Sequence, residues 1–296
     1  MKKKILITGS KGFIGRNLKE QLANDYAVFA PDSQELNLLD EGEVLSYLKN
    51  NSFDQILHCA THSATRNSEK DLNKVLENNL RMFFNLLKFK DYYGRMLYFG
   101  SGAEYDRRYY KPRMKEEYFG KHIPADDYGF SKYIMSTCIG KLDNVVCLRL
   151  FGVFGKYEDW QIRFISNAIC KTIFNLDITI KQNVIFDYLY IGDLVRIIKL
   201  MLKQEKLKYR HYNICRGETI DLKTLAGIIL SVTGKKLNVK IALKGLKKEY
   251  SGDNGRIMDE IGHISFTSHP QAISELFAWY KENKRKLDRN LLLTDK

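Results

Sequence analysis

The segment ILITGSKGFIG, residues 5–15, decides the expected fold of this 296-residue chain. An apolar run ends at Thr8, and Gly9, Gly12 and Gly15 follow at a regular spacing. Missing side chains permit a tight strand-to-helix turn and let the backbone approach a pyrophosphate, which the free N–H groups of a helix N-terminus would bind. A glycine triplet alone is also compatible with a plain turn. Its place between an expected strand and an expected helix favours a dinucleotide site.

Short apolar runs alternate with amphipathic segments throughout the first half of the chain. The pattern predicts strands at 4–8, 27–30, 55–60, 95–100 and 145–151, and helices at 13–22, 41–49, 69–89 and around 128–132. Alternation of this kind is typical of a parallel sheet covered by helices on both faces. We therefore predict an α/β fold, a Rossmann-like doubly wound parallel sheet with about six or seven βα units.

The pattern changes after Gly155. It predicts helices at 162–174, 192–204 and 219–233, with an extended segment at 178–185. Thr219 or Asp221 would cap the helix at 219–233 and Gly234 would end it, while Ser268 and Pro270 would begin a last helix. We expect a dinucleotide-binding domain of residues 1–155, to which residues 184–215 return. Residues 156–183 and 216–296 would form a smaller mixed C-terminal substrate domain.

Composition restricts the partners and the compartment. The chain has 48 basic and 35 acidic residues, a net charge of +13, which suits an anionic partner such as a nucleotide. We expect no nucleic-acid partner, because Lys is spread along the chain and no binding motif accompanies it. We expect a cytoplasmic protein without a membrane partner, because no run of about 18 apolar residues is present and the first apolar run is too short for a signal peptide. The five cysteines lack C-x-x-C spacing, which indicates reduced thiols and no metal site.

The choice between NAD and NADP depends on the end of the second expected strand. An acidic residue there binds a ribose 2′-hydroxyl, whereas a basic residue accommodates a 2′-phosphate. Asp32 favours NAD, while Lys11 in the glycine loop and Ser33 favour NADP. We predict NADP and keep NAD as the alternative.

Three side chains suggest hydride-transfer chemistry. Tyr128 and Lys132 are four residues apart in an expected helix, so the phenol and the ammonium can point into the same cleft. A phenol beside a cation can exchange a proton with a substrate oxygen, although a Tyr-x-x-x-Lys pair alone is more often an ordinary surface pair. Ser101 ends the strand RMLYFGS, at the edge where open α/β sheets place their sites. Its hydroxyl could hold negative charge on the same oxygen.

With these motifs, the chain resembles the extended short-chain dehydrogenase/reductases that act on nucleotide sugars, an NAD(P)-dependent epimerase/dehydratase family. The resemblance covers nearly the whole chain and is carried by TGSKGFIG, ILHCA, NNLRMFFNLL, GSGAEY, YGFSKY, LRLFGVFG, FDYLYIGDL and ELFAWYKEN. It implies a catalytic triad of Ser101, Tyr128 and Lys132, with Lys132 also on the nicotinamide ribose. It implies a homodimer through helices around 79–87 and 133–138. The expected cofactor contacts are Gly9, Ser10, Lys11, Gly12, Phe13, Ile14, Gly15, Asp32, Ser33, Leu38, Ala60, Asn79, Lys132 and Leu150.

Departures from the family pattern restrict the expected reaction. The family's dehydratases have an acidic pair where this chain has Gly102 and Ala103. Its GDP-sugar epimerase-reductases have a cysteine at the position of Ala103 and a later histidine, and both are missing here. Glu104 is not expected to replace the missing acid, since in an extended segment it would point away from the side of Ala103. Hydride transfer at the sugar C4 remains. We predict an NADP-dependent 4-ketoreductase, with an NAD-retaining 4-epimerase or a non-catalytic dinucleotide sensor or scaffold as alternatives.

The substrate side departs further from the family. The arginine that binds the substrate diphosphate in the family is Phe186 here, and the asparagine of the preceding turn is Gly152. Another group must hold the diphosphate, or the substrate is not a standard nucleotide sugar. The candidate substrate contacts are Ala103, Arg163, Lys181 and Arg256.

Overall fold

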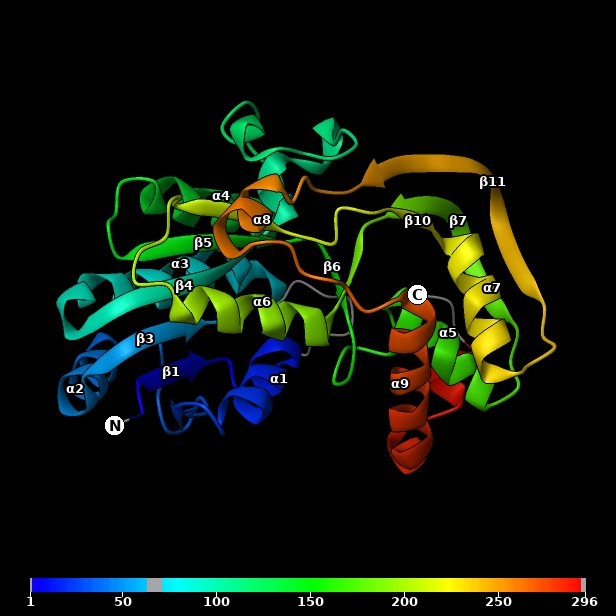
Figure 1. Cartoon of the computed structure of the whole chain (residues 1–296), viewed down its shortest axis with the longest axis horizontal. Helices are drawn as coiled ribbons and strands as arrows, with labels where there is room; N and C mark the ends of the chain where they lie inside the picture. Colours follow the sequence, from blue (N-terminus) through cyan, green and yellow to red (C-terminus); the bar gives the residue numbers. More distant parts are fainter. Residues whose placement is uncertain (1, 63–70, 294–296) are drawn as a thin grey trace.

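The computed structural model describes residues 2–62 and 71–293 (Figure 1). Its centre is a parallel six-stranded sheet in the order β2-β1-β3-β4-β5-β9. After β1 the chain adds β2 on one side and then crosses to β3 on the other. The carboxyl ends of β1 and β3 therefore form the point where open α/β sheets bind ligands. The strands are β1 (Lys4–Thr8), β2 (Ala27–Phe29), β3 (Phe53–His58), β4 (Tyr93–Ser101), β5 (Val145–Leu150) and β9 (His211–Ile214).

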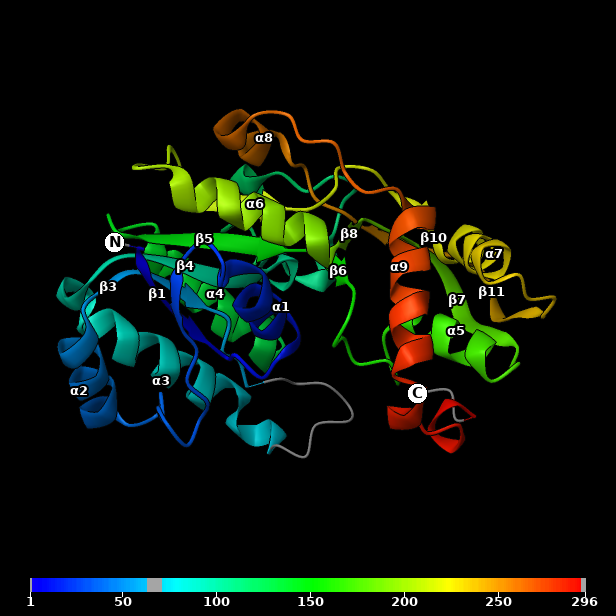
Figure 2. The same cartoon turned by 60° about the horizontal axis from the view of Figure 1, so that its bottom comes forward.

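Helices cover both faces of this sheet, as Figure 2 shows with α6 on one face and α2 and α3 on the other. Alternate residues of one strand face opposite sides, so Ile5 and Ile7 pack in one core and Leu6 in the other. The first core includes α1 (Phe13–Leu22) and α6 (Ile191–Lys203), and the second includes α2 (Glu41–Asn51), α3 (Val75–Lys88) and α4 (Asp127–Ile139). The predicted doubly wound α/β fold is confirmed.

A smaller three-stranded sheet has the order β10-β7-β11 and mixed direction. β7 (Ile178–Phe186) pairs antiparallel with β10 (Ile220–Asp221) and parallel with β11 (Val239–Tyr250). A third hydrophobic core joins this sheet to α5 (Phe164–Ile173), α7 (Leu222–Thr233) and α9 (His269–Glu282). The strands β6 (Gly152–Phe154) and β8 (Tyr188–Tyr190) pair with each other, and β6 lies between the two larger sheets in Figure 1. We call the small sheet with α5, α7 and α9 the substrate lobe.

Most predicted elements agree with the structure within a few residues. The residues that cap the helices explain why their ends could be predicted. Asp221 rather than Thr219 caps α7, because its carboxylate accepts the N–H groups of Lys223 and Thr224. Gly234 ends α7 in the left-handed region at φ +66°. Ser268 caps α9, with Pro270 in the first turn. The beginning of the predicted helix at 69–89 lies partly outside the described residues, and α3 starts at Val75.

The structure contains elements that the sequence pattern did not indicate, above all β11. The proposed boundaries between the two domains remain a proposal. Within the expected substrate portion, α8 (Gly255–Ile261) packs beside β9 and α6, and Ile257 belongs to a core of the large sheet.

Among the described residues, no helix is long and apolar enough to cross a membrane. The five cysteines are free, and three of them are buried.

Candidate active site

The glycine loop between β1 and α1 is shaped by close backbone contacts. Gly9 has φ +68°, and a Cβ placed on it would lie 2.7 Å from the backbone nitrogen of Ala60. A Cβ on Gly15 would collide with the carbonyl oxygen of Gly9. No side chain caps the start of α1, so its first N–H groups can bind an anion. The loop thus presents the backbone donors that a dinucleotide pyrophosphate requires.

Two residues that bear on the choice of cofactor meet beyond the end of β2, Lys11 from the glycine loop and Asp32 from the segment after β2. Lys11 Nζ lies 2.7 Å from Asp32 Oδ2, and the Lys11 side chain is 78% exposed. The hydrogen bond from Lys11, followed by those from the N–H groups of Gln34 and Glu35, lowers the pKa of Asp32 below its usual value. Ser33 is exposed beside Asp32, and Ser10 donates a hydrogen bond to the Pro31 carbonyl at 3.0 Å. Acidic and basic groups thus lie together where the adenosine ribose is expected.

Other predicted cofactor residues surround this loop or support it. Ala60 donates its N–H to Thr8 Oγ1 at 3.3 Å, and Asn79 Oδ1 accepts the N–H of His62 at 2.7 Å. Asn79 thereby holds the loop that follows β3 near the glycine loop. Leu38 is buried in a core of the large sheet, whereas Leu150 pairs with Ser101 across β5 and β4. Phe13 and Ile14 pack their side chains against the core below α1.

Ser101 is held by a reciprocal pair of hydrogen bonds. Its Oγ accepts the N–H of Ala103 at 3.1 Å, and Glu104 Oε1 accepts the Ser101 N–H at 3.0 Å. The expectation of an extended segment here was wrong, because residues 102–105 form a 3₁₀ helix. Glu104 is fully buried, and its other oxygen lies 2.6 Å from Arg149 Nε. The carboxylate is therefore committed to Arg149 and to the Ser101 backbone.

Tyr128 and Lys132 reach the same region from α4. Asp126 caps this helix, and Gly129 lets it approach the 3₁₀ helix, since a Cβ there would lie 3.1 Å from the Ala103 carbonyl oxygen. The buried Lys132 donates a hydrogen bond to the Phe99 carbonyl at 2.8 Å. Its Nζ lies 5.8 Å from the centre of the Tyr128 ring. The structure thus brings the phenol and the ammonium beside the segment that contains Ser101.

His58 lies near this ammonium without adding a second positive charge. Burial, together with the charge of Lys132, lowers the pKa of His58 to about 3. Its Nδ1 is 2.8 Å from the Thr8 hydroxyl. Lys132, on α4, is therefore the positive charge near the phenol of Tyr128.

The sequence analysis missed one side chain of this centre, Tyr250. It is the last residue of β11, and its phenol oxygen lies against Gly102, where a Cβ would be 2.5 Å away. Its ring packs between those of Tyr110 and Phe151 at 4.9 and 5.0 Å between centres. The alternation of Val239, Ile241 and Leu243 with lysines could have indicated the strand, but nothing local places its last residue beside Gly102.

The four candidate substrate residues are not gathered in one place. Ala103 lies in the 3₁₀ helix beside Ser101. Arg256, in α8, forms ion pairs with Glu117 and, at 3.7 Å, with Glu116. Arg163 precedes α5, and Lys181 is exposed on β7. Of the three basic residues, none is joined to Ser101, Tyr128 or Lys132 by a contact among the described residues.

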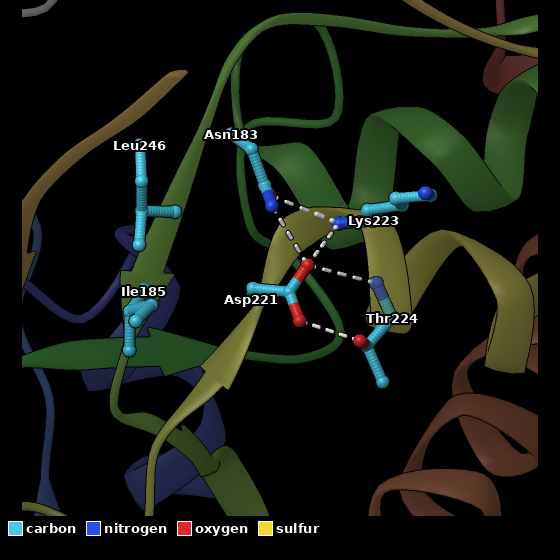
Figure 3. A pocket seen from close by; sticks show the side chains of 6 residues that line it. All are labelled: Asn183, Ile185, Asp221, Lys223, Thr224 and Leu246. Atoms are coloured by element: carbon cyan, nitrogen blue, oxygen red, sulfur yellow. Dashed lines mark hydrogen bonds between the residues drawn. The ribbon is translucent and has the colours of Figure 1, made fainter.

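A pocket in the substrate lobe is lined by none of the candidate catalytic residues Ser101, Tyr128 and Lys132 (Figure 3). Its polar groups satisfy one another, because Asn183 donates to Asp221 at 2.9 Å and Asp221 accepts the N–H groups at the start of α7. A carboxylate that already caps the helix would repel a phosphate. The pocket is lined by Asn183, Ile185, Asp221, Lys223, Thr224 and Leu246.

Comparisons with known proteins identify the family of the chain. Residues 5–215 match the model of the NAD dependent epimerase/dehydratase family. The chain belongs to this family. It is 23% identical to a dTDP-4-dehydro-6-deoxy-D-allose reductase from Streptomyces sp, over 95% of this chain and 97% of the relative.

Solved structures with the same fold include family members of two kinds. A UDP-glucose 4-epimerase from Thermotoga maritima superposes with a TM-score of 0.81 at 18% identity, over 95% of this chain and 99% of that chain. A GDP-mannoheptose C4 reductase from Campylobacter jejuni with NADP bound gives 0.81 at 19% identity, over 95% and 98%. The family comprises NAD(P)-dependent enzymes of nucleotide sugars, so the predicted enzyme class is confirmed. Family membership and the glycine loop support a nicotinamide dinucleotide as the cofactor.

Proposed function

We propose that this family member is an NADP-dependent reductase of a 4-keto nucleotide sugar. One observation supports the proposal. Glu104, the carboxylate three residues after Ser101, accepts the Ser101 N–H and forms an ion pair with Arg149, so it is not available as an acid or base beside Ser101, Tyr128 and Lys132. Elimination of water or epimerisation next to a ketone needs a further acid–base group. Hydride transfer at a single carbon needs only the triad and the cofactor.

The three side chains would divide the work around the substrate carbonyl. The bound dinucleotide supplies the hydride. Tyr128 gives its phenolic proton to the carbonyl oxygen, and Ser101 donates a hydrogen bond to the same oxygen as negative charge develops there. Lys132 offsets the charge left on the Tyr128 oxygen, because its buried ammonium faces the phenol from the next turn of α4.

The proposal of NADP rests on the ion pair at the end of β2. Asp32 already accepts hydrogen bonds from Lys11, Gln34 and Glu35, which leaves it a weaker partner for a ribose 2′-hydroxyl. Lys11 is exposed enough to turn toward a 2′-phosphate. The alternative is a 4-epimerase that retains NAD on Asp32, since the same triad can oxidise and re-reduce C4.

Cofactor identification and turnover assays separate these functions. Protein purified without added cofactor is denatured, and the released nucleotide is identified by mass spectrometry. We expect little retained NAD, and oxidation of NADPH when a dTDP- or GDP-linked 4-keto-6-deoxy sugar is added. Tightly retained NAD with interconversion of C4 epimers would establish the epimerase instead. Binding of dinucleotides without turnover of any nucleotide sugar would favour the sensor or scaffold.

We also propose a homodimer, formed by pairing of α3 and α4 with their copies. Phe84 on α3 is a large apolar side chain that is 37% exposed, in a helix that packs along α4. Light scattering should give twice the monomer mass for the wild type and less for Phe84→Glu. A wild-type monomer would contradict the proposal.

A further inference from the structure

Glu104 and Arg149 place two opposite charges in the protein interior beside the reaction centre. Both residues are fully buried, and Arg149 Nε donates to Glu104 Oε2 at 2.6 Å. Glu104 belongs to the 3₁₀ helix that follows Ser101, whereas Arg149 lies on β5, paired with Gly100 of β4. The ion pair therefore lies beside the end of the strand that carries Ser101.

Arg149 joins this pair to the helix that carries the other two candidate catalytic side chains. Its Nη2 donates to Ser136 Oγ at 2.8 Å, and Ser136 lies on α4, one turn after Lys132. Its Nη1 donates to the Tyr105 hydroxyl at 3.3 Å, and the centre of the Phe119 ring lies 4.2 Å from its Cζ. A planar guanidinium that is bound through three nitrogens and covered by a ring has little freedom to turn. Arg149 thus fixes the 3₁₀ helix relative to α4.

The second oxygen of Glu104 holds the backbone of Ser101. Glu104 Oε1 accepts the Ser101 N–H at 3.0 Å, and in the same turn the Ala103 N–H lies 3.1 Å from Ser101 Oγ. A hydroxyl has two lone pairs and one O–H. Because the Ala103 N–H occupies one lone pair of Oγ, the Ser101 O–H remains available to a substrate oxygen. The carboxylate fixes the Ser101 backbone, and the turn that it closes fixes Ser101 Oγ.

Position 100 provides the space that the carboxylate needs. A Cβ on Gly100 would collide with Glu104 Oε1 and would lie 2.6 Å from Cys147 Sγ. Closely packed interiors do not allow such short approaches. Glu104 can therefore reach the Ser101 N–H only because residue 100 has no side chain.

The buried charges of Glu104 and Arg149 are a poor source of stability. Their removal from water offsets much of their attraction, and replacement of a buried ion pair by apolar residues of similar volume is often neutral or stabilising. Loss of one partner alone is harmful, because it leaves the other charge buried and unpaired. A contact that adds little stability but holds Ser101 in place points to a role in the geometry of the reaction centre.

We infer that Glu104 and Arg149 are positioning residues: the pair holds Ser101 at a fixed place relative to α4, so that its hydroxyl can donate to the substrate carbonyl. The inference rests on the proposed reductase function for its effect on turnover. The pair acts through Ser101 and needs no contact with the substrate. It also explains why position 100 is glycine.

The kinetic test replaces both charges at once, because either single change would leave a buried charge unpaired. The double variant Glu104→Leu, Arg149→Met should lower kcat for a 4-keto nucleotide sugar about 30-fold, with little change in KM. In a Ser101→Ala background the same two changes should lower kcat by less than about twofold, since the pair acts only through Ser101. Equal losses in the two backgrounds, or an unchanged kcat, would overturn the inference.

Two further variants separate positioning from folding. Leu48→Ala shortens a buried side chain of α2 and should lower the thermal midpoint, without lowering kcat at a temperature where the protein is folded. Gly100→Ala keeps both charges but displaces the carboxylate, and it should lower kcat as the double variant does. Thermal unfolding and a fluorescence titration with NADPH show which variants are folded. If the double variant and Gly100→Ala both fail to fold, the pair serves folding and the inference is wrong.

A test without substrate separates this inference from the proposed function. Protein labelled with nitrogen-15 serine gives a Ser101 amide resonance, identified by its absence from Ser101→Ala. Its hydrogen exchange should be slow in the wild type and at least about tenfold faster in the double variant, whereas the amide of the buried Ser166 on α5 should be unaffected. An unchanged exchange rate at Ser101 would overturn the inference even if the reductase assay succeeds. Faster exchange without reduction of any ketosugar would support the positioning of Ser101 and show that the proposed reaction is wrong.

Discussion

The cofactor side and the substrate side of the site are built in different ways. The cofactor side depends on backbone atoms, as where the absent side chains of Gly9 and Gly15 allow the loop to close against Ala60 and against itself. The substrate side depends on side chains from segments far apart in the sequence, such as Tyr110, Phe151, Phe186 and Tyr250. A local motif can specify the first kind of site. In the second kind of site, substitution of a single side chain can alter which substrate binds. This fits a family whose members act on different nucleotide sugars.

Tyr128 lies where the two sides meet, and its removal should have the largest effect. Tyr128→Phe deletes the proposed proton donor and should lower kcat by about 10²- to 10⁴-fold. The affinity for NADPH should remain close to that of the wild type, because Lys132 and the glycine loop are intact. Stopped-flow absorbance of NADPH and a fluorescence titration measure the two quantities. Substantial turnover by this variant would place the chemistry elsewhere.

The free energy of unfolding should depend on pH through a buried carboxyl group on the substrate side. On the substrate side, burial raises the pKa of Glu158 to about 8, although Ser166 donates to it at 2.7 Å. The folded chain keeps this proton up to about pH 8, whereas the unfolded chain releases it near the usual value of 4.5. The stability from Glu158 is thus fully present below pH 4.5 and is lost as the pH rises toward 8, at up to about 1.4 kcal/mol per pH unit.

Urea unfolding at several pH values measures this difference. Glu158→Gln should keep the hydrogen bond to Ser166 and lose less stability than the wild type between pH 5 and 8, by up to about 4 kcal/mol. Replacement of the exposed Glu205 by Gln is the control and should leave the slope unchanged. Equal slopes for the wild type and Glu158→Gln would show that this carboxyl is ionised in the folded protein.

A glycine substitution tests whether the substrate side needs the space at position 102. Gly102→Ala should displace the Tyr250 phenol or the adjacent Ser101 and lower kcat about tenfold. Gly227→Ala is the matched control, because a Cβ there meets nothing within 4 Å and should leave kcat unchanged. Thermal unfolding of both variants shows whether a loss of activity comes from a loss of folded protein. Full activity of folded Gly102→Ala would mean that the phenol is not needed at that place.

The smallest expected effect is on the cofactor side. Lys11→Ala should weaken NADPH binding about fivefold at low salt and leave NADH binding unchanged or slightly stronger, because only NADPH has a 2′-phosphate. Replacement of the exposed Lys19 by Ala removes the same charge from α1 and should affect neither. Isothermal titration with both dinucleotides measures the ratio. An equal loss for NADH and NADPH would contradict the proposed role of Lys11.

Local signals predicted the cofactor side and much of the fold. The glycines of the first loop, the four-residue spacing of Tyr128 and Lys132, and the Ser268 cap act within one turn or one helix, so their geometry can be derived from neighbouring residues. The 3₁₀ helix after Ser101 was not predicted. It forms because Glu104 turns inward to Arg149, and that partner lies on another strand.

β11 shows why the rest could not be derived in the same way. Val239, Ile241 and Leu243 alternate with Lys240 and Lys244, but most residues of β11 are exposed, so no buried face marks the strand, and its hydrogen bonds to β7 hold it in place. The sequence by itself determined the parallel sheet, the dinucleotide loop and the Tyr128–Lys132 pair, because each depends on residues close together in the chain. Only the tertiary structure decided that Tyr250 lies against Gly102 and that Glu104 is bound by Arg149. Those contacts join distant segments: the first needs β11 to lie beside the large sheet, and the second needs β4 and β5 to pair within that sheet.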